Sequence, residues 1–129
     1  MTATIRKGYW DFPWGQAHYR ALGAPNSGPA MILLHQSPLS SRNYERLLPE
    51  LSGSCDPFAV DTPGYGASSH IPESWQVADY AQFVWDCADR IGAEKIVLFG
   101  RATGAVFAIE AAMARPKRVH CLILHGMPV

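Results

Sequence analysis

The sequence predicts an α/β fold in which a mostly parallel sheet carries helices on both faces. Short apolar runs of strand length alternate along the chain with longer segments of helical periodicity. The runs are apolar almost throughout, which is typical of parallel strands buried on both faces. The 129 residues contain 48% apolar and 17% charged side chains, so the chain is one globular domain or part of one.

The first element that we predict is an antiparallel hairpin. Its strands lie in residues 4–9 and 16–22, which alternate weakly between apolar and polar side chains. The turn is built on Phe12-Pro13-Trp14-Gly15, where proline and glycine favour the backbone angles of a turn. Residues 24–29 are a loop by composition.

Four later apolar runs are predicted to be buried strands, and three segments between them have helical spacing. The strands lie at 30–35, 57–61, 95–100 and 120–125. Strands that alternate with helices in this way form right-handed βαβ units.

The three helices have distinct start and stop signals. The first ends near Gly53 and presents four apolar residues on one face. These are Tyr44, Leu47, Leu48 and Leu51. The second is expected to begin after Ser74 as N-cap and to end at Gly92, a C-cap glycine. The third, 103–115, is apolar or small on most sides, so we expect it to be covered on most sides until Pro116 stops it.

Charge and cysteine content exclude several function classes. Eleven basic and eleven acidic side chains cancel and no basic patch is evident, so we expect no nucleic-acid partner. We find no signal-peptide layout and no apolar run of roughly 18 residues, so we expect no membrane segment. Cys55, Cys87 and Cys121 are odd in number and lack metal-ligand spacing, which predicts free thiols and a reducing, cytoplasmic location. We expect no metal and no cofactor. We expect Cys87 and Cys121 to be buried.

The predicted strands end in unusual sequences, at the sheet edge where ligands bind in open parallel sheets. These ends are His35-Gln36-Ser37-Pro38, Asp61-Thr62-Pro63-Gly64-Tyr65-Gly66 and Gly100-Arg101-Ala102-Thr103-Gly104. Together and in this order they resemble the α/β-hydrolase family. Members of that family carry an oxyanion loop H-G-x-P, then D-x-P-G-x-G-x-S, then a nucleophile elbow G-x-S-x-G. The resemblance covers about residues 16–129.

The resemblance implies a role for each residue of the last motif. Gly100 and Gly104 would leave space for a strained turn that lifts the central residue, Ala102, into the site. The oxyanion hole would use the backbone N–H groups of Thr103 and Ser37, beside the positive end of the following helix.

Ala102 departs from the family pattern because a methyl group cannot attack a carbonyl. A serine removed by design, a natural branch without an elbow serine and a decayed site would each explain it. The surrounding pattern resembles a branch of bacterial α/β-hydrolases whose elbow reads G-x-H-T-G, which favours the natural branch. Thr103 is disfavoured as a displaced nucleophile because the residue after the elbow offers its N–H.

Other polar residues near these strand ends have structural interpretations beside the functional ones. We expect His35 to support the oxyanion loop rather than transfer a proton. Gln36 replaces the family's glycine and either reaches into the pocket or ties the loop down. Asp61 is expected to brace the turn that follows it, and Arg101 to be solvated rather than bind an anion. His125 is the weakest candidate.

We expect residues 1–129 to be the N-terminal part of a single α/β-hydrolase core that lacks the cap and the C-terminal strands. The acid and the histidine of a triad follow the nucleophile in this family, so neither is assigned here. The parent enzyme is expected to hydrolyse an ester or similar small acyl substrate, with this chain nearly inactive. A non-catalytic ligand-binding protein and a partner-dependent subunit are the alternatives. The last strand is an apolar edge that a partner chain or a C-terminal half would cover.

Overall fold

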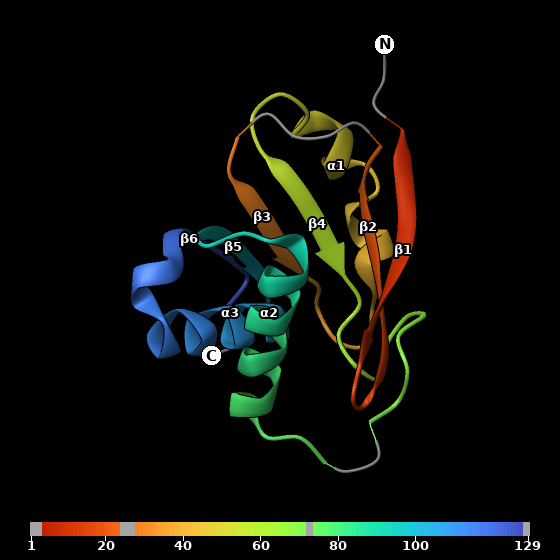
Figure 1. Cartoon of the computed structure of the whole chain (residues 1–129), viewed down its shortest axis with the longest axis vertical. Coiled ribbons are helices and arrows are strands. Elements are labelled where there is room, and N and C mark those ends of the chain that lie inside the picture. Colours follow the sequence, from red (N-terminus) through yellow and green to blue (C-terminus); the bar gives the residue numbers. More distant parts are fainter. Residues whose placement is uncertain (1–3, 24–27, 72–73, 128–129) are drawn as a thin grey trace.

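A single sheet organises the chain, with strand order β1-β2-β4-β3-β5-β6 (Figure 1). The computed structural model describes residues 4–23, 28–71 and 74–127. Strands β3, β4, β5 and β6 run parallel, whereas β1 and β2 are antiparallel to their neighbours. The strands are β1 (Ile5–Phe12), β2 (Gly15–Leu22), β3 (Ala30–Leu34), β4 (Asp56–Val60), β5 (Ile96–Arg101) and β6 (Val119–His125). The predicted α/β fold with a mostly parallel sheet is confirmed.

The N-terminal hairpin forms as the sequence predicts, with longer strands. Its register pairs Ile5 with Leu22 and Phe12 with Gly15, so the turn consists of Pro13 and Trp14 alone. Part of the predicted loop at 24–29, residues 24–27, lies outside the described residues.

The predicted helix before Gly53 is instead two short turns. They are the 3-10 turn η1 (Ser41–Tyr44) and the helix α1 (Leu47–Glu50). Pro49 explains the break, because a proline has no N–H to donate to the carbonyl four residues earlier and its ring crowds that carbonyl. The four apolar residues predicted to share a face do pack together against one side of the sheet. The predicted apolar face is therefore confirmed, whereas the prediction of one continuous helix is wrong.

Helix α2 (Val77–Ile91) begins later than predicted. Its N-cap is Gln76, whose N–H donates to the Asp79 carboxylate at 2.7 Å. Ser74 is therefore not the cap, because the acidic residue three positions after Gln76 fixes the start of the helix. Gly92 ends the helix in the left-handed conformation with φ of 83°, as predicted.

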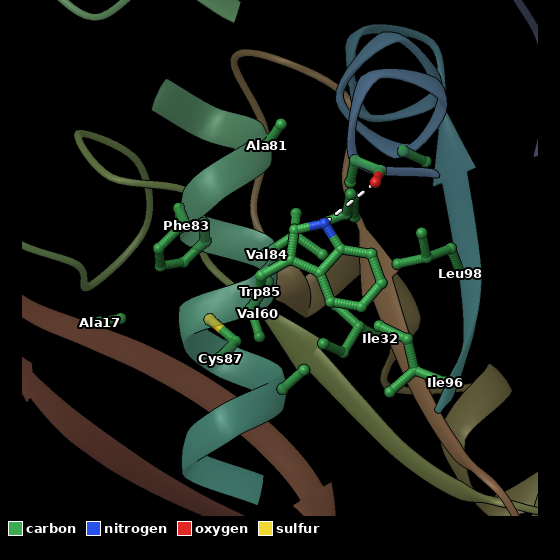
Figure 2. Close-up of a cluster of buried hydrophobic side chains, with 14 residues drawn as sticks. Ala17, Ile32, Val60, Ala81, Phe83, Val84, Trp85, Cys87, Ile96 and Leu98 are labelled. Atoms are coloured by element: carbon green, nitrogen blue, oxygen red, sulfur yellow. Dashed lines mark hydrogen bonds between the residues drawn. The ribbon is translucent and has the colours of Figure 1, made fainter. Parts of the chain in front are cut away.

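Helices cover both faces of the sheet because successive strand residues point to opposite sides. Ile32 and Leu34 of β3 face α2 and α3 (Thr103–Ala114), while Met31 and Leu33 face η1 and α1. Figure 2 shows Trp85 of α2 at the centre of the first cluster, where its indole N–H donates to the Ala111 carbonyl of α3 at 3.0 Å. This bond and the apolar cluster around it fix α3 relative to the sheet.

The side of the molecule formed by α3 and β6 is more exposed than the sequence predicts. Only Gly104, Ala105, Ala108 and Ala111 of α3 are buried, and Met113 is 72% exposed, so the helix is not covered on most sides. Strand β6 follows the 3-10 turn η2 (Pro116–Arg118) and occupies the end of the sheet order. Cys121 on this strand is exposed, contrary to prediction, whereas Cys55 and Cys87 are buried. An edge strand has a neighbour on one side only, which leaves its side chains accessible.

Two kinds of feature are absent from residues 4–23, 28–71 and 74–127. None of their helices has the length and apolar character needed to cross a membrane. None of their histidine, cysteine and acidic side chains gather in a group of three or more that would hold a metal ion.

Candidate functional site

The three unusual strand ends meet at one edge of the sheet. In the parallel register Leu34 of β3 lies opposite both Val60 of β4 and Gly100 of β5, so the three strands end at the same level. The segments that follow them are therefore neighbours, as expected for the carboxyl edge of a parallel sheet. This edge positions every residue of the candidate site.

The turn between β5 and α3 is strained at Ala102. With φ of 53° and ψ of −117°, Ala102 has the only positive φ of a non-glycine residue among those described. Its N–H donates to the His125 carbonyl at 3.0 Å, and its own carbonyl accepts from Ala105 at 2.9 Å. A side chain in this region of backbone space costs of order 1–3 kcal/mol and persists only where the surroundings impose it. The bonds on both sides of Ala102 impose it here.

The glycines that flank Ala102 are required by the approach of α3 to the sheet. A Cβ on Gly100 would lie 2.4 Å from the Gly104 carbonyl oxygen. A Cβ on Gly104 would lie 2.4 Å from the Leu34 oxygen and 2.8 Å from the His35 oxygen. All of these atoms are backbone, so no side chain can move aside. The first turn of α3 therefore packs directly on the end of β3.

Ser37 and Thr103, the two expected N–H donors, lie together but are bonded to each other. The Ser37 N–H donates to the Thr103 hydroxyl oxygen at 2.7 Å. Thr103 is the first residue of α3, where N–H groups have no acceptor within the helix. The structure thus brings the two predicted donors close together. One of them, the Ser37 N–H, is already bonded to the Thr103 hydroxyl, which was not predicted.

The buried side chain of His35 is hydrogen-bonded through both ring nitrogens and lies beneath the loop that carries Ser37. Its Nε2 accepts from the Thr62 N–H at 3.1 Å, so the proton is on Nδ1, which lies 2.9 Å from the Gln36 carbonyl oxygen. Burial lowers the pKa of His35, against the opposing effects of the Gln36 carbonyl and the Asp61 charge. A neutral ring with both nitrogens engaged supports the loop and is a poor proton carrier.

Gln36 itself is partly buried. Its carbonyl accepts from His35 and from the Leu39 N–H, while its side-chain amide makes no hydrogen bond within the described part of the chain. The backbone of Gln36 therefore holds the loop, and the side chain does not.

Asp61 organises the loops from beneath. Its carboxylate accepts from the Ser41 N–H at 2.7 Å, from the Ala67 N–H at 2.9 Å and from His18 Nδ1 at 2.9 Å. Burial raises the pKa of Asp61, but the bonds from Ser41, Ala67 and His18 outweigh burial and bring the pKa below its usual value. Asp61 is thus an ionised brace between the segments after β3 and β4.

The family of the chain follows from a comparison with known proteins. A model described as the alpha/beta hydrolase fold matches residues 29–128. The chain belongs to the α/β-hydrolase family.

Similar proteins include one that is named as a carboxylesterase and one that is named as a hydrolase. An uncharacterized carboxylesterase of Bacillus subtilis is 32% identical over 113 residues, which are 86% of this chain and 37% of the relative. A 2-hydroxy-6-oxononadienedioate/2-hydroxy-6-oxononatrienedioate hydrolase of Pseudomonas putida is 33% identical over 129 residues, with 96% and 43% of the two chains covered.

Solved structures agree on the fold. The naproxen esterase of Bacillus subtilis has a TM-score of 0.84 at 26% identity, over 93% of this chain and 42% of that one. A haloalkane dehalogenase from Bradyrhizobium elkani has a TM-score of 0.88 at 24% identity, over 96% and 42%. The α/β-hydrolase chain described here therefore spans less than half the length of each of these relatives.

The two weaker candidates, Arg101 and His125, lie beside the turn. Among the described residues, their side chains form no hydrogen bond with the site. Arg101 is exposed. Burial raises the pKa of Tyr44 to about 12, although the charge of Arg101 acts in the opposite direction. The Tyr44 hydroxyl donates to the Leu34 carbonyl at 3.0 Å, so it braces the end of β3. The side chain of His125 is exposed, and its contribution to the site is the backbone carbonyl bonded to Ala102.

The sequence analysis missed His18 and Arg20, which approach the site from β2. His18 bonds Asp61, and an Arg20 guanidinium N–H donates to the Ser41 hydroxyl, with Glu45 3.4 Å from Arg20 Nε. Both side chains are nearly buried. The available signal was their alternate spacing on one predicted strand, which places two polar residues on the same face.

Proposed function

We propose that the protein is built on the scaffold of an enzyme that hydrolyses an ester or similar small acyl substrate, and that the β5–α3 turn is its nucleophile elbow. The observation that carries the proposal is the backbone of Ala102. It has a strained positive φ at the carboxyl edge of the sheet, between two glycines that close backbone contacts require. A turn of this kind holds the side chain of its central residue above the sheet, where a substrate binds.

As the chain stands, we propose that it forms no acyl-enzyme. Ala102 ends in a methyl group, which has no lone pair to attack a carbonyl carbon. The remaining contribution is electrostatic, from the Thr103 N–H and the positive end of the 12-residue helix α3. Without a nucleophile, stabilisation of this kind leaves only residual catalysis.

The substrate class and the rest of the protein belong to the same proposal. The names of the carboxylesterase and naproxen esterase relatives support a small carboxylic ester. We assign residues 1–129 to the N-terminal part of one α/β-hydrolase core, with the triad acid, the histidine and the cap in other segments. Three free thiols support a reducing, cytoplasmic location.

The test restores a nucleophile in the full-length protein. Ala102→Ser is expected to gain hydrolysis of p-nitrophenyl acetate and covalent labelling by a fluorophosphonate, with mass spectrometry locating the adduct at position 102. Ala102→Gly is the matched control, since it changes the same backbone position without adding a hydroxyl. If Ala102→Ser folds yet shows neither labelling nor hydrolysis, the esterase proposal fails.

A non-catalytic ligand-binding protein is the second candidate, and the methyl group of Ala102 at the centre of the strained turn favours it, because no nucleophile stands at that position. Small-molecule binding to the unmodified protein without turnover, together with no gain from Ala102→Ser, would favour this candidate. A partner-dependent subunit is the third. It is supported by the exposed apolar side chains Ile123 and Leu124 on β6 and would be revealed by an obligate partner chain.

A further inference from the structure

The Thr103 hydroxyl lies where a bound oxyanion would accept hydrogen bonds. Its oxygen is 2.7 Å from the Ser37 nitrogen, which is the separation of a strong N–H···O bond. The same oxygen belongs to the first residue of α3, so covalent geometry keeps it close to the Thr103 N–H as well. In the proposed oxyanion site, the oxygen of a tetrahedral intermediate would accept from the Ser37 N–H, which the Thr103 hydroxyl oxygen already engages.

The surroundings hold the two partners of this bond at a fixed separation. Close contact between Gly104 and the Leu34 and His35 carbonyls sets the distance from α3 to the end of β3. The other end of the Ser37 loop is held by Asp61, which accepts from the Ser41 N–H. Because neither side moves easily, a ligand oxygen cannot reach the Ser37 N–H by widening the gap. It can reach that group only if the Thr103 side chain turns away.

We infer that the Thr103 hydroxyl is a built-in occupant of the proposed oxyanion site, which a ligand oxygen must displace from the Ser37 N–H before it binds there. The inference rests on the proposed function, because it assumes that ligand oxygens bind beside Ala102. Thr103 is partly exposed, and no second partner of its hydroxyl is found in the described part of the chain. Rotation about its Cα–Cβ bond therefore breaks one hydrogen bond and needs no unfolding.

Thr103 therefore sets the affinity of the proposed oxyanion site for a ligand and takes no part in nucleophilic attack. Removing the hydroxyl frees the Ser37 N–H, so a ligand oxygen no longer competes with an internal acceptor. The gain is that of one neutral hydrogen bond, roughly 3- to 10-fold in affinity. Thr103→Ala removes the hydroxyl, and Thr103→Ser keeps it, which makes the pair a matched comparison.

The experiment is an NMR titration of the intact protein that needs no turnover. Phenylphosphonate, a tetrahedral oxyanion with an aromatic group, is added to the unmodified protein, Thr103→Ala and Thr103→Ser, and the Ser37 and Thr103 amide signals are followed. We expect Thr103→Ala to reach half-saturation at a concentration about fivefold lower than the other two proteins. Before phenylphosphonate is added, the Ser37 amide should also exchange with solvent faster in Thr103→Ala.

The remaining outcomes separate this inference from the proposed function. Equal half-saturation in all three proteins would overturn the inference alone, since the site would still bind an oxyanion. Weaker binding by Thr103→Ala would overturn it as well, because the hydroxyl would then be a donor to the ligand. If no variant shifted the Ser37 amide, both the inference and the proposed oxyanion site would be overturned. Unfolding of each variant is measured alongside, because a purely structural role would change stability without changing half-saturation.

Discussion

His18 Nδ1 and the Asp61 carboxylate lie 2.9 Å apart in the interior, joining β2 to the loop after β4. The other oxygen of the same carboxylate accepts from the Ser41 N–H, just beyond the loop that carries Ser37. A single buried charge therefore connects the N-terminal hairpin with both loops at the carboxyl edge of the sheet.

Replacing Asp61 by asparagine should destabilise the protein by about 3 kcal/mol at pH 7, because the buried carboxylate accepts hydrogen bonds from Ser41, Ala67 and His18, and a neutral amide with one oxygen cannot replace all of them. The folded-state pKa of Asp61 lies below its usual 3.8, so its contribution is complete above that pH and is lost as the pH falls below it. Urea unfolding at pH 7 and pH 3.5 should show the difference between the two proteins shrinking at low pH. Exposed Glu94→Gln is the control, and a difference that does not change with pH would contradict the assignment.

His35→Gln should flatten the pH dependence of stability in weakly acidic solution. Burial lowers the folded-state pKa of His35 below 6.5, so the unfolded chain takes up a proton first and stability falls as the pH drops below 6.5. The loss reaches at most about 1.4 kcal/mol per pH unit until the folded-state pKa is passed. Urea unfolding at pH 7.5, 6 and 5 measures the slope. His125→Gln, at an exposed position, should leave stability at pH 7 unchanged. A variant whose slope matched that of the unmodified protein would refute a buried, neutral His35.

Ala102→Gly should stabilise the protein by about 1 kcal/mol. Glycine relieves a strain of order 1–3 kcal/mol, and the greater freedom of the unfolded chain offsets about 0.4–1 kcal/mol of that gain. Ala112→Gly in the interior of α3 is the matched control and should destabilise by about 1 kcal/mol, the opposite sign. The midpoints of denaturant unfolding measure the change in stability when the slopes of the transitions are unchanged. Destabilisation by Ala102→Gly would mean that the turn is unstrained.

Gly104→Ala should be severely destabilising, by more than about 3 kcal/mol, because its methyl group would overlap the backbone carbonyls of Leu34, which ends β3, and of His35, which follows it. Gly53→Ala is the comparison, because at this position the cost comes from backbone conformation and not from overlap. Gly53 has a positive φ, of 86°, which Gly104 lacks, and no atom lies within 4 Å of its added Cβ. Its replacement should lower stability by about 1 kcal/mol. Thermal unfolding of both variants tests the comparison, and equal losses would show that α3 does not pack as closely on β3 as described.

The order and type of most elements were predictable from local features of the sequence. Apolar runs of strand length, helical spacing and the glycines and prolines between them act over a few residues, and those signals located the hairpin and the strands. The importance of the three strand ends and of the Ala102 position followed from the resemblance of their sequences to motifs of the α/β-hydrolase family. Of the local signals, Pro49 and the cap at Gln76 were misread, although both are visible in the sequence.

The hydrogen-bond partners within the site depend on tertiary packing. The bond from Ser37 to Thr103 joins residues 66 positions apart, and the pair of His18 with Asp61 joins residues 43 apart. The exposure of Cys121 likewise depends on β6 lying at the edge of the sheet. Local sequence fixes backbone conformation, but which donor meets which acceptor depends on where the packed core places each loop. The resemblance to the family therefore implied two backbone donors at this edge, whereas packing bonds the Thr103 hydroxyl to one of them, the Ser37 N–H.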